Sequence, residues 1–258
     1  GAVFDAALES EFHACQFAHD IDEDVWYMES TSTWMEDVVY DSINDYVQYL
    51  SSFLTYPYYA LDADGSGGLR IYGSCVWNHY LSDNYSPQAI ADIWYQLESA
   101  TSTFSNIDLA LGGYGTDLKT EVQRFSVWNF FTGTRNDGSH YNEGSLWPLV
   151  PMQATHVTFP VTDAVRGTSV KPDHLGCNYV RFTYPSSGWN GLLVSYDGPS
   201  TLTTPNGALL NYVASGSAMG HEYGDITLNG FGVGEALFYD WNEMTFSPRW
   251  CSSSPRTQ

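Results

Sequence analysis

Apolar residues recur at helical spacing through the first half of the chain. The earliest of them follow one another at intervals of four and three residues and so share one helix face: Phe4, Leu8, Phe12 and Cys15. Two longer stretches, from Trp26 to Leu54 and from Tyr72 to Leu81, have the same periodicity. The pattern therefore predicts helices throughout this half.

Two further helices have recognisable ends. Ser86 can cap a helix and Pro87 suits the first helical position, so a helix is expected from there to Leu97. The stretch 117–132 repeats apolar residues at the same spacing, and Gly133 offers a stop. Both segments should bury one apolar stripe against the other helices.

The pattern changes near Trp147. Beyond it, apolar and polar residues alternate in short runs separated by Gly, Pro, Asn and Ser, and Val180, Phe182 and Tyr184 fall on one face of such a run. Similar runs cover 191–198, 208–215, 225–233 and 236–241. Short, regularly spaced strands are typical of an antiparallel sandwich. The sequence thus predicts an α+β fold, with a helical domain at 1–147 and a small antiparallel β-sandwich domain at 148–258.

The chain is strongly acidic. Its 30 acidic residues outnumber two Lys and seven Arg, and the formal net charge is −21. Such a field repels phosphate backbones and anionic lipid, which argues against nucleic acid and membrane surfaces as partners. No apolar run approaches the roughly 20 residues of a membrane span. A hydrated acidic surface accounts for the charge most simply, and attraction of divalent cations is the alternative.

Cysteine usage, the scarcity of Lys and a glycosylation sequon at Asn84 indicate an extracellular, oxidising setting. The four cysteines allow three pairings. We favour Cys15–Cys75 with Cys177–Cys251, because each bridge then stays within one half of the chain. The start of the chain lacks the basic and apolar segments of a signal peptide, so a secretion signal is expected upstream.

Four stretches of the chain carry a family resemblance. They are 11–37 (EFHACQFAHDIDEDVWYMESTSTWMED), 72–83 (YGSCVWNHYLSD), 125–148 (FSVWNFFTGTRNDGSHYNEGSLWP) and 176–182 (GCNYVRF). Together they resemble the gluzincin-like metalloproteases, a family of large secreted bacterial proteins known first from myxobacteria. In that family an opening helix carries His-Glu-x-x-His, and a Glu in a later Trp-x-x-Glu stretch is the third zinc ligand. The resemblance implies a zincin-like helical domain in which His13 is the second zinc His and Glu29 the third ligand.

The chain departs from that family at the residues that carry the chemistry. Glu9 stands where the first zinc His is expected, and Ser10 where the catalytic Glu is expected. Glu9, His13 and Glu29 can still bind a divalent metal, but two carboxylates weaken the metal as a Lewis acid. A serine hydroxyl stays protonated near neutral pH and cannot act as general base. Because only eight residues precede Glu9, the strand layer of a zincin is also expected to be missing.

Two other ligand sites are weaker. Asp62, Asp64 and Ser66 supply oxygen atoms at alternate positions, as calcium loops do, but the third Asp and the distant bidentate Glu of an EF-hand are missing. A plain glycine-rich turn is therefore favoured there. Trp189 and Trp241 are candidates for stacking on sugar rings, although most such aromatics belong to a core. Calcium is thus preferred to zinc as a bound ion, and glycans are a candidate partner.

These features predict a secreted, non-catalytic member of a metalloprotease-like family. We expect it to act as a structural or assembly subunit in the extracellular space, through self-association or contact with another extracellular protein. Two alternatives remain open. An active zinc metallopeptidase requires Glu9, His13 and Glu29 to converge on one metal, and a carbohydrate-binding module requires a row of exposed aromatic residues on the sandwich.

Overall fold

The computed structural model describes residues 12–13, 15–20, 22–64, 68–98, 102–156, 173–183, 210–214, 220–221 and 233–239. The chain divides into two compact units, Gly1–Tyr56 with Asp62–Leu149, and Pro57–Leu61 with Val150–Gln258. The described helices lie in the first unit and the described strands in the second. The predicted domains, 1–147 and 148–258, stay a prediction.

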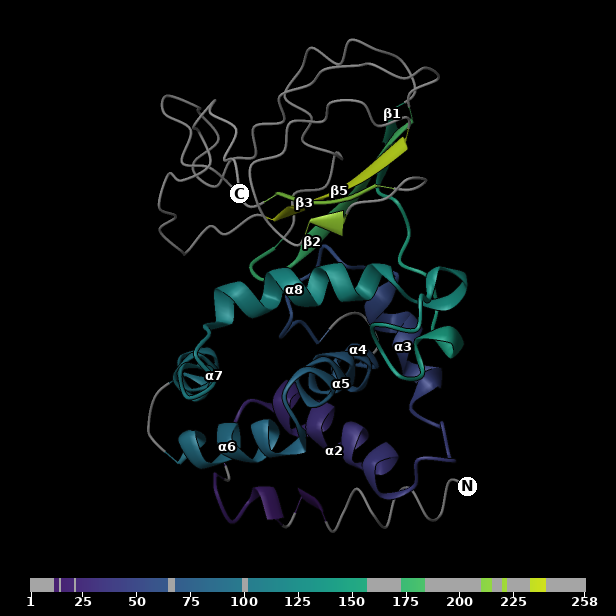
Figure 1. The fold of residues 1–258 in the computed structure, drawn as a ribbon. Coiled ribbons are helices and arrows are strands. Elements are labelled where there is room, and N and C mark those ends of the chain that lie inside the picture. The colour runs from purple at the N-terminus through teal and green to yellow at the C-terminus, as the bar shows by residue number, and fades with distance from the viewer. Residues whose placement is uncertain are drawn as a thin grey trace, which may run out of the picture. The chain divides into compact units, whose positions relative to one another are not determined.

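The first unit is built from helices (Figure 1). They are α2 (Val25–Val39), α3 (Val47–Leu54), α4 (Arg70–Gly73), α5 (Cys75–Asn84), α6 (Pro87–Leu97), α7 (Thr103–Gly112) and α8 (Leu118–Phe130). Residues 12–13 and 15–16 are also helical. Two 3-10 turns follow α8, η1 (Gly133–Arg135) and η2 (Gly144–Leu146). In the ranges that the structure describes, no helix is long and apolar enough to cross a membrane.

Helix α5 is the central helix of this unit (Figure 1). Its residues 75–81 are all buried, although several of them are polar. Trp77 meets Phe125 of α8 with ring centroids 5.2 Å apart, and Tyr80 meets Trp128 at 5.3 Å. A helix that is buried on every side must be enclosed by its neighbours. The enclosing helices here include α2, α6 and α8.

The helix ends follow the local sequence pattern in part. Helix α6 begins at Pro87, as predicted, but Ser86 makes no side-chain capping bond. The helix predicted at 117–132 is α8. Asp117 is its N-cap, and the Asp117 carboxylate accepts a hydrogen bond from the backbone N–H of Thr120 at 2.6 Å.

The chain just beyond α8 requires glycine. Gly133 has a φ of +55°, and a Cβ there would lie 2.9 Å from the carbonyl oxygen of Trp147. Both the backbone conformation and the lack of space therefore exclude a side chain. Of the first predicted helix face, Phe12 and Cys15 lie in described helical segments, whereas Phe4 and Leu8 lie outside the described residues.

The described strands of the second unit form one sheet. They are β1 (Ala154–His156), β2 (Cys177–Thr183), β3 (Leu210–Ala214), β4 (Gly220–His221) and β5 (Val233–Tyr239). Their order in the sheet is β1-β2-β5-β3-β4. Strand β1 pairs in parallel with β2, and the other neighbours pair antiparallel.

The predicted fold class, a zincin-like helical half followed by an antiparallel β-sandwich, is therefore wrong. The described strands make a single mixed sheet and not two antiparallel layers. Alternation of apolar and polar residues identifies a strand and its two faces, but neither the partner of the strand nor its direction. The three-residue strand β1 is too short to show alternation at all. The strand predicted at 191–198 lies outside the described residues.

Candidate functional site

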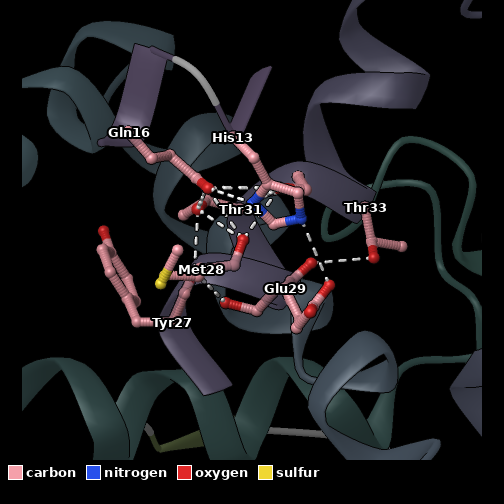
Figure 2. Close-up of polar contacts among 9 residues, drawn as sticks. His13, Gln16, Tyr27, Met28, Glu29, Thr31 and Thr33 are labelled. Carbon is pink, nitrogen blue, oxygen red and sulfur yellow. Dashed lines mark hydrogen bonds and ion pairs between the residues drawn. The ribbon is translucent and has the colours of Figure 1, made fainter. Parts of the chain in front are cut away.

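The structure brings His13 and Glu29 together. His13 lies in the helical segment that precedes α2, and Glu29 lies in the second turn of α2. The Nε2 atom of His13 is 3.6 Å from Oε2 of Glu29, and both side chains are about four-fifths buried, with 20% and 19% exposed. In Figure 2 the imidazole ring of His13 lies between Gln16 on one side and Glu29 on the other.

Gln16 determines the tautomer of His13. The amide nitrogen of this buried Gln donates to the carbonyl oxygen of Met28 at 2.8 Å and to Oγ1 of Thr31 at 2.7 Å. A carbonyl oxygen can only accept, so this contact fixes which end of the amide faces α2. The amide oxygen then faces Nδ1 of His13 at 2.6 Å. Nδ1 must therefore carry a proton and donate it to Gln16.

This tautomer leaves Nε2 of His13 to interact with Glu29. At 3.6 Å the two atoms are too far apart for a good hydrogen bond. Two ligands of one tetrahedral zinc ion, each about 2.0–2.1 Å from it, lie about 3.4 Å apart. An imidazole whose Nδ1–H donates to an oxygen is also the usual second-shell arrangement of a metal-binding His. The spacing of the two atoms therefore fits two ligands of one metal ion better than it fits a hydrogen bond.

The middle of α2 is unusually rich in buried hydroxyl groups. Ser30, Thr31, Ser32 and Thr33 are all buried. Each donates to a carbonyl oxygen three or four residues earlier, for example Thr31 to Tyr27 at 2.7 Å. Hydroxyls that bond within their own helix can be buried without an unsatisfied donor. This polar segment therefore packs in the interior and presents oxygen acceptors to Gln16.

The structure describes only two of the three predicted metal ligands. His13 and Glu29 come together, but Glu9 and the adjacent Ser10 lie outside the described residues. Within the described part of the chain, no group of three or more His, Cys, Asp or Glu residues could hold a metal ion. The donors described here thus fit two positions of a metal site, one fewer than the three protein ligands of a catalytic zinc.

The predicted calcium loop is also placed only in part. Asp62 is half-buried and Asp64 is exposed, while Ser66 lies outside the described residues. Gly68 has a φ of +74°, a backbone conformation typical of a glycine turn. Calcium binding at this loop stays a prediction.

One of the two predicted disulfide bridges needs correction. Cys15 and Cys75 are free thiols, whereas the bridge predicted between Cys177 and Cys251 stays a prediction because Cys251 lies outside the described residues. Cys15 is exposed whereas Cys75 is fully buried, so the bridge predicted between them is not formed. Two cysteines in the same half of the chain need not lie close together in space, and a disulfide requires close approach of the two Cα atoms.

The structure describes one of the predicted glycan positions. Asn84 is an exposed residue at the end of α5, and its side-chain nitrogen donates to the carbonyl oxygen of Tyr80 at 3.1 Å. Glycosylation there stays a prediction. Trp189 and Trp241, the candidates for sugar stacking, lie outside the described residues.

A second buried polar cluster was missed by sequence reasoning. Nδ1 of His79, in α5, lies 4.0 Å from Oδ2 of Asp37 at the end of α2. The imidazole stacks on Tyr46 with centroids 4.7 Å apart. Tyr46 donates its hydroxyl proton to Oε2 of Glu143 at 2.5 Å and accepts from the indole N–H of Trp147 at 3.0 Å. These residues come from separate segments, so no local motif could have indicated the cluster.

Burial controls the charges in this cluster. Burial lowers the pKa of His79 to about 3. It raises the pKa of Asp37 to about 7, with further increases from the negative charges of Glu143, Asp41 and Asp83. Between about pH 3 and pH 7 the imidazole of His79 and the carboxyl of Asp37 are therefore both neutral. We do not regard their 4.0 Å contact as an ion pair. Among the described residues, neither Nε2 of His79 nor Oδ1 of Asp37 has a hydrogen-bond partner.

Comparison of the chain with protein-family models, with curated proteins and with solved structures returned no match. The resemblance to gluzincin-like metalloproteases therefore stays a prediction from the sequence.

Proposed function

We propose that this chain is a non-catalytic relative of the gluzincin-like metalloproteases and acts outside the cell as a structural or assembly subunit. The observation that carries the proposal is the pairing of His13 with Glu29 at 3.6 Å, supported by the buried amide of Gln16. These two residues occupy positions that the resemblance assigns to zinc ligands. Their polar partners give them a role in the fold that requires no hydrolysis.

The missing general base supports the absence of catalysis. A hydrolytic zinc site needs a carboxylate beside the metal to accept the proton of water, and Ser10 stands at that position. The other described side chains that bond His13 are those of Gln16 and Ser32. Neither an amide nor a hydroxyl ionises near neutral pH. Among the described side chains near His13, Glu29 is thus the one that could act as a general base. The resemblance, however, makes Glu29 a metal ligand.

Exposed apolar side chains support the assembly role. Val38, Val39, Tyr40 and Ile43 lie within six residues of one another at the end of α2 and just beyond it, and they are 38–47% exposed. A group of large apolar residues on the surface is typical of a protein–protein contact. Such a surface supports the role of an assembly subunit.

Two measurements on the full chain test this proposal. Incubation with zinc and a fluorogenic peptide library should give no hydrolysis above the blank. Sedimentation velocity should show concentration-dependent association, and Val38→Ser with Val39→Ser should weaken it at least about tenfold. The matched control is Leu69→Ser, because Leu69 is 52% exposed elsewhere on the first unit. Hydrolysis that His13→Ala abolishes would overturn the first part, and a monomer at every concentration would overturn the second.

A second candidate is metal binding by Glu9, His13 and Glu29. The specific observation in its favour is that Nε2 of His13 and Oε2 of Glu29 are spaced as two ligands of one ion would be. A bound divalent metal would supply Lewis-acid polarisation of a water molecule. Elemental analysis of the parent and of Glu29→Gln tests this candidate, since zinc near one per chain that is lost in the variant would favour it. No zinc in either sample would remove it.

A further inference from the structure

Helices α6 and α7 leave a shallow groove between them on the surface of the first unit. The groove has a volume of about 440 Å³. Asp92, Tyr95 and Gln96 line it from α6, and Leu109, Gly113 and Tyr114 line it from α7 and the turn that follows. It is distinct from the His13–Glu29 pair, and nothing in the proposed function uses it.

Asp92 gives the groove a carboxylate that makes no ion pair among the described residues, while the neighbouring His19 pairs with Glu98 instead. The Asp92 carboxylate accepts from the Gln88 amide at 2.8 Å and from the Tyr114 hydroxyl at 2.6 Å, which hold it in place. Both donors are neutral groups. In the described part of the chain no Lys, Arg or His forms an ion pair with Asp92. Helix α7 also ends here, and its C-terminus adds partial negative charge.

Aromatic and apolar side chains complete the lining. Tyr95 is 59% exposed and Leu109 is 62% exposed. The ring of Tyr95 is held edge-on by His19, with centroids 5.1 Å apart. Burial and the bond to Asp92 raise the pKa of Tyr114 to about 12, so its hydroxyl stays a neutral donor at physiological pH. The groove therefore combines an oriented carboxylate, two neutral tyrosine rings and an aliphatic surface.

We propose that this groove binds an alkylammonium group such as the side chain of a lysine. A cation is attracted both by the carboxylate and by the faces of aromatic rings. The aliphatic stem would lie on Leu109 and Tyr95 while the ammonium group reaches Asp92. The net charge of −21 makes a cationic segment of another molecule the complementary partner. The ligand is thus a lysine-bearing segment of a partner protein.

The test uses n-butylammonium as the probe and n-butanol as its neutral analogue, with the full chain, by saturation-transfer NMR titration. Asp92→Asn should weaken n-butylammonium binding at least about tenfold, and Tyr95→Ala about fivefold. The matched control is Asp22→Asn, because Asp22 is exposed and its loss changes the net charge equally. That control should bind as the parent does, and n-butanol should bind far more weakly.

Three results would overturn the proposal. Equal weakening in Asp92→Asn and Asp22→Asn would mean that the probe follows net charge. Equal binding of n-butanol would mean that the surface recognises only alkyl groups. Displacement of the probe by a glucose oligomer, itself weakened by Tyr95→Ala, would make the groove a sugar site. Thermal unfolding of each variant confirms that it is folded before the titration.

Discussion

The Nε2 atom of His13 lies 3.6 Å from Oε2 of Glu29, and Gln16 decides that it is Nε2 and not Nδ1 that faces the carboxylate. The amide of Gln16 is anchored on α2 by its bonds to Met28 and Thr31, so it acts as a fixed acceptor for the imidazole (Figure 2). The orientation of the His ring is therefore a property of a buried network and not of the pair alone.

Loss of the Gln16 side chain should destabilise the protein. Gln16 is 2% exposed, and its removal leaves the Nδ1–H of His13 and the hydroxyl of Thr31 without this partner. We expect Gln16→Ala to lower the free energy of unfolding by about 2–3 kcal/mol. Urea denaturation measures this. The control is Gln48→Ala at an exposed position, where a change within about 0.5 kcal/mol is expected. Equal effects of the two substitutions would contradict the role given to Gln16.

Asp37 should make the protein less stable as the pH rises. Its pKa is about 7 in the folded chain against an ordinary value of 3.8, so the folded state binds this proton more tightly. The contribution of the Asp37 carboxyl to the free energy of unfolding is fully present below about pH 4 and is lost as the pH rises to about 7. Because the carboxyl is only partly desolvated, we expect about 2 kcal/mol and not the full linkage value. The difference in stability between Asp37→Asn and the parent should therefore shift in favour of the variant across this window. A difference that does not change with pH would contradict the prediction.

His79 should have the opposite effect in an overlapping window. Its pKa falls from 6.5 to about 3 on burial, so the unfolded chain binds this proton more tightly. The stabilisation is present above about pH 6.5 and is lost as the pH falls toward 3. His79→Gln should therefore gain stability relative to the parent as the pH falls, as measured by urea denaturation between pH 7 and pH 4. A parallel pair of pH curves would show that His79 does not titrate in this way.

Gly73 of α4 lies directly against α3. A Cβ on Gly73 would lie 2.6 Å from the carbonyl oxygen of Tyr49 and 2.7 Å from Oγ of Ser52. The backbone oxygen cannot move away without displacing α3, so Gly73→Ala should cost about 2 kcal/mol of unfolding free energy. Gly112→Ala is the control, because among the described residues no atom outside its own helical turn lies within 4 Å of a Cβ there, and it should gain about 0.5 kcal/mol. Thermal unfolding of both variants measures these changes. A similar loss of stability in each variant would contradict the steric explanation.

The local pattern of the sequence was sufficient for individual helices. Spacing of apolar residues and the position of Pro87 predicted α6, and the same spacing predicted α8. These features are local, because a helix forms its hydrogen bonds within one segment. The resemblance singled out His13 and Glu29, which the tertiary structure brings together.

Only the tertiary structure decided the rest. Periodicity shows which face of a helix or strand is buried but not what covers that face. The sequence therefore did not indicate that β1 pairs in parallel with β2. It also did not indicate that Cys15 and Cys75 stay free. Nor did it place Asp37 beside His79, because the two residues lie on different helices and meet only when those helices pack. Elements form from neighbours in sequence, whereas pairing, burial and charge depend on segments that meet in space.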